Sequence, residues 1–462
     1  MFLSDTIAAI ATAPGEAGIG IVRISGNKAI DIANKIFKSK KGKNLVDFDE
    51  RRVNYGYILN PDTNEKVDEV LAVYMRSPFT YTTEDIVEIH CHGGFIPVKK
   101  ILELVLRMGA RSAEPGEFTK RSFLNGRIDL AQAEAVMDLI SAKTDKGFDV
   151  ALDQLEGSLS KKVKEIIKNL MDILAHIEVS IDFADEEDVD EVTLDILIKR
   201  SNEVKDEIKL LLETADTGKI IREGLNTVII GKPNVGKSSL LNALLGESRA
   251  IVTEVPGTTR DIIEEQLSIK GIPIKIIDTA GIRETEDIVE KIGVERSKQF
   301  FNKAELIIFM LDISSELTKE DFEILELIKV RKALVIINKT DLPSKLDESA
   351  ISQYIENKKI IKLSIAEEKG IDELENAIVD MVYSGDVRTK DRLLVTNVRH
   401  KNALERALDS IVEGLEAMNK KLPMDFIEVD VKNCWEALGE ITGETVAEDL
   451  IDHIFQNFCI GK

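Results

Sequence analysis

The pattern of apolar and polar positions divides the chain into four segments. Residues 1–118 alternate short β-like runs with two helical stretches, which predicts a mixed α+β domain. Residues 119–217 carry apolar positions at helical spacing over long runs without strand signals, which predicts a helical domain. Strands and helices alternate over residues 218–384, as in a parallel α/β sheet. The helical pattern returns over residues 385–462.

The first segment contains four candidate strands and two candidate helices. The strands are expected at "GIGIVRIS", "RRVNYGYIL", "EVLAVYMRS" and "DIVEIHCHGG", and the helices at Lys28–Phe37 and Pro97–Met108. In the second segment, long amphipathic helices are expected at "AQAEAVMDLISAKT", "LSKKVKEIIKNLMDILAHIEVSIDF" and "LDILIKRSNEVKDEIKLLLETADTGKIIREG". The acidic stretch "DFADEEDVDE", just before the last of these, is expected to be a solvated loop.

The order helical, α/β, helical indicates that an α/β domain is inserted into a discontinuous helical domain. Insertions are tolerated where chain ends lie close together. A length of 462 residues also favours two or three domains over a single core. The expected fold class is therefore multidomain, α+β and α/β, with an N-terminal α+β domain, a discontinuous helical domain and an inserted α/β domain.

Composition restricts the class of protein further. The net charge of -22 opposes autonomous binding to a polyanion, so any RNA contact should be local or supplied by a partner. No apolar run approaches the roughly 20 residues of a membrane helix, and the first residues lack the basic stretch of a signal or transit peptide. The three cysteines are far apart and do not form a disulfide framework. We therefore expect a cytoplasmic protein with no membrane partner.

A phosphate-binding motif, G-x-x-x-x-G-K-S, runs from Gly231 to Ser238 between a β-branched run and a helical pattern. The two glycines let the loop fold around phosphates, Lys237 reaches the β- and γ-phosphates, and the Ser238 hydroxyl binds Mg²⁺. The motif alone predicts a nucleoside triphosphatase without specifying the base. The nucleotide contacts expected from this loop are Asn234, Val235, Gly236, Lys237, Ser238 and Ser239.

The stretch "VIINKTDL" specifies the base. The Asp341 carboxylate can accept from the ring N–H and the exocyclic amine of guanine together, whereas adenine offers no such pair of donors. Asn338 and Lys339 are expected to brace this loop, and Ser364 in "IKLSIAEEKGID" fits the last loop that contacts the base. Ile365 replaces the small residue usual after that serine. Together with the phosphate loop, these residues predict GTP binding by a Ras-like G domain.

Two segments between these motifs should contact the γ-phosphate. "PGTTR" offers Thr259 as a second Mg²⁺ ligand, and "DTAG" ends a strand where the γ-phosphate would lie. Ile282 then occupies a position where many GTPases have a glutamine that orients water, so another group must assist hydrolysis. The contacts expected here are Thr253, Glu254, Val255, Pro256, Gly257, Thr258, Thr259, Asp278, Thr279, Ala280 and Gly281.

This block resembles the translation-factor-like GTPases with a hydrophobic residue in place of the catalytic glutamine. The whole chain resembles the MnmE, or TrmE, family of tRNA modification GTPases. The matching segments include "DTIAAIATAPGEAGIGIVRISG", "TTEDIVEIHCHGG", "EPGEFTKRSFLNGRIDLAQAEAVMDLI", "HIEVSIDFADEED", the nucleotide motifs and the terminal "FCIGK". The resemblance covers nearly the full length of the chain.

The resemblance implies how hydrolysis is assisted. Glu290 would orient the attacking water, although without the resemblance it is equally one of many surface glutamates. An amide oxygen of Asn234 can help to bind a monovalent cation beside the phosphates. The family implies potassium, K⁺, held also by backbone oxygens of Thr253, Val255 and Thr258, and pairing of G domains across a homodimer. A cationic finger, Arg260 or Arg283, is the alternative.

The N-terminal segment offers weaker signals. His90, Cys91 and His92 suggest a zinc site, but on a strand the two histidines would point one way and the cysteine the other. The resemblance instead implies a reduced folate at the dimer interface, with 5,10-methylene-tetrahydrofolate as one-carbon donor and 5-formyl-tetrahydrofolate as its analogue. Cations suit the folate tail carboxylates, and a carboxylate suits the pterin N–H edge. The family's folate residues fall on Arg23, Glu88, Arg127 and Lys462.

The terminal "FCIGK" places Cys459 three residues from the last residue of the chain. Its thiol is either a nucleophile toward uracil or a buried small hydrophobic group. The resemblance implies a joint reaction with an MnmG-type flavoprotein that uses FAD and NADH, in a heterotetramer. The pair would add an aminomethyl or carboxymethylaminomethyl group at C5 of the wobble uridine of certain tRNAs.

Two other classes of protein compete with this interpretation. A regulatory or ribosome-assembly GTPase without nucleoside chemistry fits the nucleotide motifs equally well, but leaves the folate segment and "CIGK" unexplained. A structural dimerising scaffold leaves unexplained why Lys237, Ser238 and Asp341 occur together in order.

Overall fold

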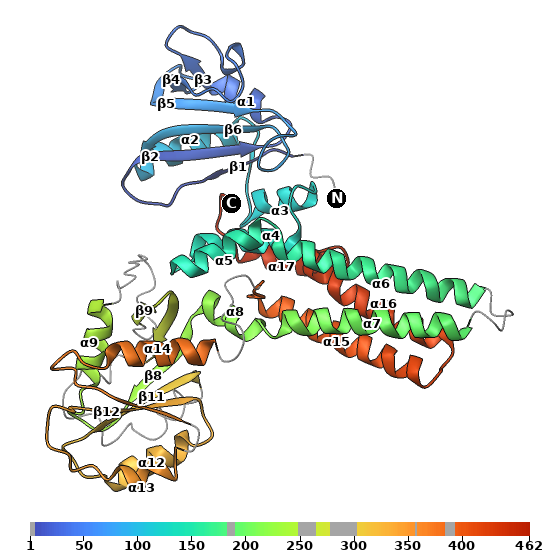
Figure 1. Cartoon of the computed structure of the whole chain (residues 1–462). Coiled ribbons are helices and arrows are strands. Elements are labelled where there is room, and N and C mark those ends of the chain that lie inside the picture. The colour runs from blue at the N-terminus through green and yellow to red at the C-terminus, as the bar shows by residue number, and fades with distance from the viewer. Residues whose placement is uncertain (1–4, 183–189, 248–264, 278–302, 356–357, 384–392) are drawn as a thin grey trace. The chain divides into compact units, whose positions relative to one another are not determined.

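The computed structural model describes residues 5–182, 190–247, 265–277, 303–355, 358–383 and 393–462 (Figure 1). The chain separates into two compact units. The N-terminal unit comprises Met1–Met137, Leu155–Val163 and Gly439–Lys462, and the second unit comprises Asp138–Gln154 and Lys164–Leu438. The expected boundaries at residues 118, 217 and 384 remain predictions.

A seven-stranded sheet forms the body of the N-terminal unit, in the order β3-β4-β5-β6-β2-β1-β7. All neighbouring strands are antiparallel except β1 and β7, which are parallel. The strands are β1 (Ile7–Ile10), β2 (Ala17–Ser25), β3 (Phe37–Ser39), β4 (Asn54–Leu59), β5 (Lys66–Met75), β6 (Ile86–Gly93) and β7 (Arg111–Ser112). The four strands predicted from the sequence are confirmed as β2, β4, β5 and β6.

Two helices, α1 (Ala29–Ile36) and α2 (Phe95–Arg107), confirm the two helical predictions in this unit. Their apolar positions pack with alternate residues of the strands in one core, because successive strand residues point to opposite faces. Val22, Ile24, Val87 and Ile89 belong to that core. Arg23 and Glu88 lie opposite each other between them, so their side chains project from the other face of the sheet.

A buried arginine ties the start of the chain to α3 (Glu117–Leu124). Arg121 is 1% exposed, and its guanidinium donates to Asp5 Oδ1 at 2.7 Å, Glu117 Oε1 at 2.9 Å and Glu84 Oε1 at 3.0 Å. Burial alone would raise the pKa of Glu117, but hydrogen bonds from Arg111, the Glu114 amide and Arg121 hold that pKa below its ordinary value. The three carboxylates therefore compensate the buried cation.

The first two helical stretches of the second segment are confirmed as single helices, α4 (Leu130–Ser141) and α6 (Ser158–Asp182), whereas the third is divided. The helices that accompany them are α5 (Asp145–Leu155), α7 (Asp190–Leu212), α8 (Ala215–Glu223), α15 (Val398–Asn419), α16 (Met424–Thr442) and α17 (Glu448–Gln456). The prediction of one helix from Leu194 to Gly224 is wrong, because the helix ends after Leu212 and restarts at Ala215. There the Thr214 hydroxyl donates to the Leu211 carbonyl and accepts from the Val395 amide.

The second unit contains a six-stranded sheet in the order β13-β12-β11-β8-β10-β9, parallel except for β9. The strands are β8 (Leu225–Ile230), β9 (Glu265–Ile269), β10 (Ile272–Ile276), β11 (Leu306–Asp312), β12 (Ala333–Asn338) and β13 (Lys359–Lys362). The helices described alongside these strands are α9 (Lys237–Glu247), α12 (Lys319–Ile328), α13 (Glu348–Ser352) and α14 (Ile371–Val382). This is the α/β arrangement that the sequence predicts.

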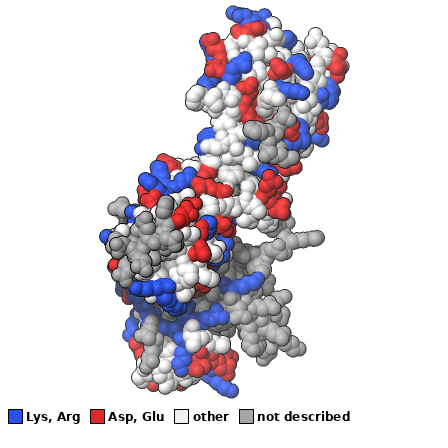
Figure 2. All heavy atoms as spheres, turned by 90° about the vertical axis from the view of Figure 1, so that its right-hand side faces the viewer, with Lys and Arg blue, Asp and Glu red and all other residues white. Residues whose placement is uncertain are grey.

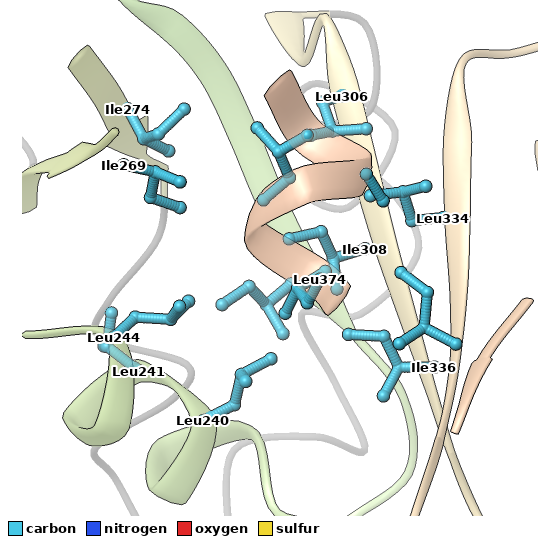
Figure 3. Close-up of a cluster of buried hydrophobic side chains, with 14 of the residues drawn as sticks. Leu240, Leu241, Leu244, Ile269, Ile274, Leu306, Ile308, Leu334, Ile336 and Leu374 are labelled. Carbon is cyan, nitrogen blue, oxygen red and sulfur yellow. The ribbon is translucent and has the colours of Figure 1, made fainter. Parts of the chain in front are cut away.

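Both faces of the parallel sheet are covered, which explains why its central strands are apolar at almost every position. On one face, Leu240 and Leu244 of α9 and Leu374 of α14 pack against Ile308 and Ile336 of the sheet (Figure 3). On the other face, residues of α12 and α13 pack in a second core. The strand residues of this core alternate along β11 and β12 with those of the first core. The two layers hold the strand ends in fixed positions.

The fold class predicted from the sequence is confirmed: α+β sheet unit, separated helical stretches and an inserted α/β sheet. None of the helices in the described ranges is long and apolar enough to cross a bilayer. Acidic and basic side chains are interspersed over the N-terminal unit, which is drawn at the top of Figure 2.

Replacing Arg121 with methionine tests the buried cation. The variant Arg121→Met should lower the free energy of unfolding by about 3–5 kcal/mol, because the buried Glu117 loses one of its two arginine partners and Glu84 loses its bond to the same cation. The measurement is urea denaturation at neutral pH. Because the folded-state pKa of Glu117 lies below its ordinary 4.5, this difference should be complete above that pH and shrink as the pH falls further.

Arg107→Met is the matched control. Arg107 is 51% exposed and pairs with the exposed Asp62, so its loss should cost at most about 1 kcal/mol. If both variants lost the same free energy of unfolding, the buried position of Arg121 would contribute nothing beyond an exposed ion pair.

Candidate functional site

The phosphate-binding motif forms a tight loop between the end of β8 and the start of α9. Gly231 has φ 149°, Asn234 φ 62° and Gly236 φ 106°, values that glycine adopts easily and asparagine tolerates better than most residues. Lys237 lies in the first turn of α9, and its ammonium group donates to the carbonyls of Gly231 and Lys232, both at 2.8 Å. Burial lowers the pKa of Lys237. An anion in this loop would therefore relieve the desolvation of the ammonium group.

Asn338, at the end of β12, joins this loop to the loop that follows β13. Its buried amide nitrogen donates to the Val235 carbonyl at 2.8 Å, and its amide oxygen accepts from the Ile365 N–H at 3.4 Å. A Cβ on Gly236 would lie only 2.4 Å from the Asn338 amide nitrogen. The loop can approach Asn338 this closely only because residue 236 is glycine.

The residues expected to recognise the base lie at the same edge. The Ser364 hydroxyl donates to Asp341 Oδ1 at 2.5 Å, which leaves the second carboxylate oxygen for other donors. Lys339 donates to Asp312 Oδ2 at 2.5 Å. Ile365 fills the position of the usual small residue without disrupting the loop, because its backbone amide makes the bond to Asn338.

The structure thus gathers the sequence-predicted nucleotide contacts that it describes along the carboxyl ends of β8, β12 and β13, as parallel sheets require of a site. These are Asn234, Val235, Gly236, Lys237, Ser238, Ser239, Asn338, Lys339, Asp341 and Ser364. The remaining predicted contacts lie outside the described residues: Thr253, Glu254, Val255, Pro256, Gly257, Thr258, Thr259, Asp278, Thr279, Ala280, Gly281 and Glu290, with the alternative fingers Arg260 and Arg283.

Sequence reasoning missed two anchors of this site. Asp312 ends β11 and holds Lys339; burial would raise the pKa of Asp312, but bonds from Lys339 and Ser314 keep it below its ordinary value. Lys232 pairs with the buried Asp321, which also caps α12. A cavity of about 130 Å³ lies between these two pairs and Asn234. Asp312 could have been found, since it is the polar residue that ends an apolar strand.

A second cluster lies in the N-terminal unit and joins segments from both ends of the chain. Arg23 Nε donates to Glu88 Oε1 at 2.9 Å, and Arg23 Nη1 donates to the Gly461 carbonyl at 3.2 Å. The Tyr81 ring lies beside both Arg23 and Arg127, with guanidinium carbons 5.9 and 5.0 Å from its centroid. Arg127 also donates to the Tyr81 carbonyl at 3.2 Å. Tyr81 was not expected from the sequence.

The C-terminal segment is fixed against β1. Gly461 has φ 93°, and a Cβ there would lie 2.2 Å from the Ile10 carbonyl oxygen, so only glycine fits. Lys462, the last of the four predicted folate residues, directly follows it. Cys459 is exposed while its carbonyl accepts from the Gly116 amide, so the alternative of a buried hydrophobic group is wrong.

The zinc alternative finds no support in the described part of the chain. There, no group of three or more histidine, cysteine, aspartate or glutamate side chains could hold a metal ion. The buried Cys91 thiol faces the Gly20 carbonyl, and burial raises its pKa to about 11. His92 pairs with Asp68 at 2.7 Å on the opposite face. The alternation expected along this strand is therefore present, and it separates the candidate ligands.

Gly236→Ala tests the close approach of the phosphate loop to Asn338. The added methyl group would meet the Asn338 amide, and the residue would retain a strained positive φ, so GDP affinity should fall at least about tenfold. The measurement is titration with a fluorescent GDP analogue. Gly246→Ala is the control, because Gly246 lies in α9 with nothing within 4 Å of an added Cβ, and its affinity should stay unchanged. Normal affinity of Gly236→Ala would show that the loop relaxes freely.

Two family models match successive parts of the chain. A family model described as the MnmE helical domain matches residues 130–459, and one described as the GTP-binding protein TrmE N-terminus matches residues 6–127. The tRNA modification GTPase MnmE of Alkaliphilus metalliredigens is 71% identical over 462 residues, 100% of both chains. That of Clostridioides difficile is 57% identical over 462 residues, again 100% of both.

Among solved structures, the G domain of the T. maritima FeoB iron transporter is 27% identical and covers 34% of this chain and 97% of its own, with a TM-score of 0.26. The family models and the full-length relatives identify the family. This chain belongs to the MnmE family of tRNA modification GTPases.

Proposed function

We propose that this protein is a GTPase that acts in tRNA modification. The observation that carries the proposal is identity of 71% over the full length to a tRNA modification GTPase. The gathered phosphate and base loops support it, because Lys237 and Asp341 lie on loops that Asn338 and Ser364 hold at one sheet edge. Within that site, Asp341 selects guanine, and Lys237 exchanges its two carbonyl partners for phosphate oxygens.

Hydrolysis requires positive charge where the phosphate oxygens gain negative charge. Ser238 and Thr259 would hold Mg²⁺, and Asn234 with backbone oxygens of Thr253, Val255 and Thr258 would hold K⁺, which would supply that charge. Asn234 fits this role, because it is exposed on the phosphate loop and presents an amide oxygen.

The water and the partner domain complete the proposed hydrolysis step. Glu290 would orient the attacking water, in place of the glutamine that Ile282 replaces. The G domains of a homodimer would pair to complete the site.

The cluster around Tyr81 fits a folate. Neither Arg127 nor Lys462 forms an ion pair with a carboxylate among the described residues, so two cations remain for the tail carboxylates. Glu88 is 20% exposed and offers a carboxylate to N–H donors of a pterin, while Arg23 holds it in place. When bound, 5,10-methylene-tetrahydrofolate would supply the one-carbon unit.

The modification itself would be shared with another protein. With an MnmG-type flavoprotein that uses FAD and NADH, in a heterotetramer, the protein would add an aminomethyl or carboxymethylaminomethyl group at C5 of the wobble uridine. Cys459 is exposed, so its thiol is accessible as a nucleophile toward uracil. The partner would supply most of the basic surface for tRNA, because this chain carries a net charge of -22.

Lys237→Ala tests the function directly. Loss of the phosphate-binding cation should lower kcat for GTP at least about a hundredfold, and replacing potassium with sodium should slow the parent protein. Cells that carry only this variant should lose the C5-modified wobble uridines, as measured by mass spectrometry of tRNA nucleosides. Lys359→Ala is the control, because it removes an exposed lysine at the start of β13. It should retain both GTP turnover and the C5-modified wobble uridines.

Each outcome has a distinct meaning. Lost GTP turnover with normal uridines would favour a GTPase without nucleoside chemistry. Equal rates in potassium and sodium would remove the proposed monovalent-cation site and leave the guanine specificity in place.

Arg127→Met tests the folate site. Calorimetry of the full chain with 5-formyl-tetrahydrofolate should show about tenfold weaker binding, because one charged contact to a tail carboxylate is lost. Arg107→Met should bind as the parent does, because Arg107 ends α2, which packs on the sheet face opposite Arg23 and Glu88, and pairs with Asp62. Unchanged binding by Arg127→Met would place the folate elsewhere.

A further inference from the structure

A second hollow lies at the edge of the parallel sheet opposite the nucleotide loops. Its volume is about 480 Å³, and it is lined by the first residues of β8 and β11, the loop before β12, the end of α14 and one side of α8. The nucleotide site lies at the carboxyl ends of these same strands, so the hollow belongs to neither of the sites described above. Its size falls within the range of small-molecule sites.

Its polar lining carries an excess of positive charge, because four basic side chains and two carboxylates line it. Asp216 is already paired with Lys401 at 2.8 Å, and Glu305 with Lys219 at 3.2 Å. Lys303 and Lys332 also line the hollow, and neither forms an ion pair with any residue in the described part of the chain. In a chain of net charge -22, two such lysines at one cavity are unusual.

The remaining lining is apolar. Leu225 is 5% exposed, Leu306 1% and Val382 4%, so they form a floor that continues into the sheet core. Ile220 and Met381 are half-buried and form the sides. An occupant that matched this lining would carry an anionic group for the lysines and an apolar body for the floor.

We propose that this hollow binds a small organic anion, a carboxylate, sulfonate or phosphate on a ring or short apolar body. A nucleic-acid backbone matches it less well, because phosphates would meet only the two lysines and would leave the apolar floor uncovered. Binding here would contact both connections of the nucleotide domain, since Ile220 and Leu225 lie where the chain enters the sheet and Met381 and Val382 where it leaves.

The test uses anilinonaphthalene sulfonate, a fluorescent probe with a sulfonate on an apolar body, with the full chain saturated by GDP. The parent should bind the probe saturably. The variants Lys303→Glu and Lys332→Glu should each weaken that binding about tenfold, because a charged contact becomes repulsive. Met381→Trp should abolish it by filling the hollow. GDP affinity and the thermal transition should match the parent in all three and so establish that the variants fold.

Lys329→Glu is the matched control, because Lys329 lies in the same loop, is 52% exposed and does not line the hollow. It should bind the probe as the parent does. Parent-like binding by Lys303→Glu, Lys332→Glu and Met381→Trp would overturn the proposal, as would an equal loss in Lys329→Glu. If the charge reversals instead weakened binding of tRNA and left the probe unaffected, the surface would serve a polyanion and the small-anion site would be wrong.

Discussion

The nucleotide site depends on one buried amide. Asn338 donates to the carbonyl of Val235 and accepts from the amide of Ile365, so a single side chain at the end of β12 fixes the loops after β8 and β13. An unpaired amide buried there would be costly, so either bond alone would leave the arrangement strained. The bonds are possible because parallel strands place their carboxyl ends at one edge, and because Gly236 leaves room for the amide.

In the N-terminal unit, contacts between residues from opposite ends of the chain likewise hold a cluster together. Gly461 lies against the Ile10 carbonyl, and its own carbonyl accepts from Arg23, so the end of the chain completes a cluster that begins near its start. The buried Arg121 holds residue 5 and α3 together beneath that cluster. Loss of either contact should therefore affect the Tyr81 cluster as well as stability.

The two edges of the parallel sheet have opposite chemistry. At the carboxyl edge, Lys237 and Lys339 are held by protein oxygens in a loop shaped for phosphates and a base. At the amino edge, Lys303 and Lys332 lie beside an apolar floor, and the two carboxylates that line the same hollow are paired with other lysines. Both edges are fixed by the same two packed layers of helices.

The sequence by itself determined the features that depend on local chemistry. The phosphate loop, the Asp341 that we propose selects guanine, and the alternation of strands and helices follow from residue type and spacing, because glycine conformation and side-chain periodicity are local properties. Only the tertiary structure placed Asp312 beneath Lys339, Tyr81 beside Arg23 and Arg127, and Gly461 against Ile10. It also ended α7 at Leu212, where Thr214 bonds to a segment that lies far along the chain. Such contacts arise from strand register and packing between distant segments, and local periodicity carries no information about either.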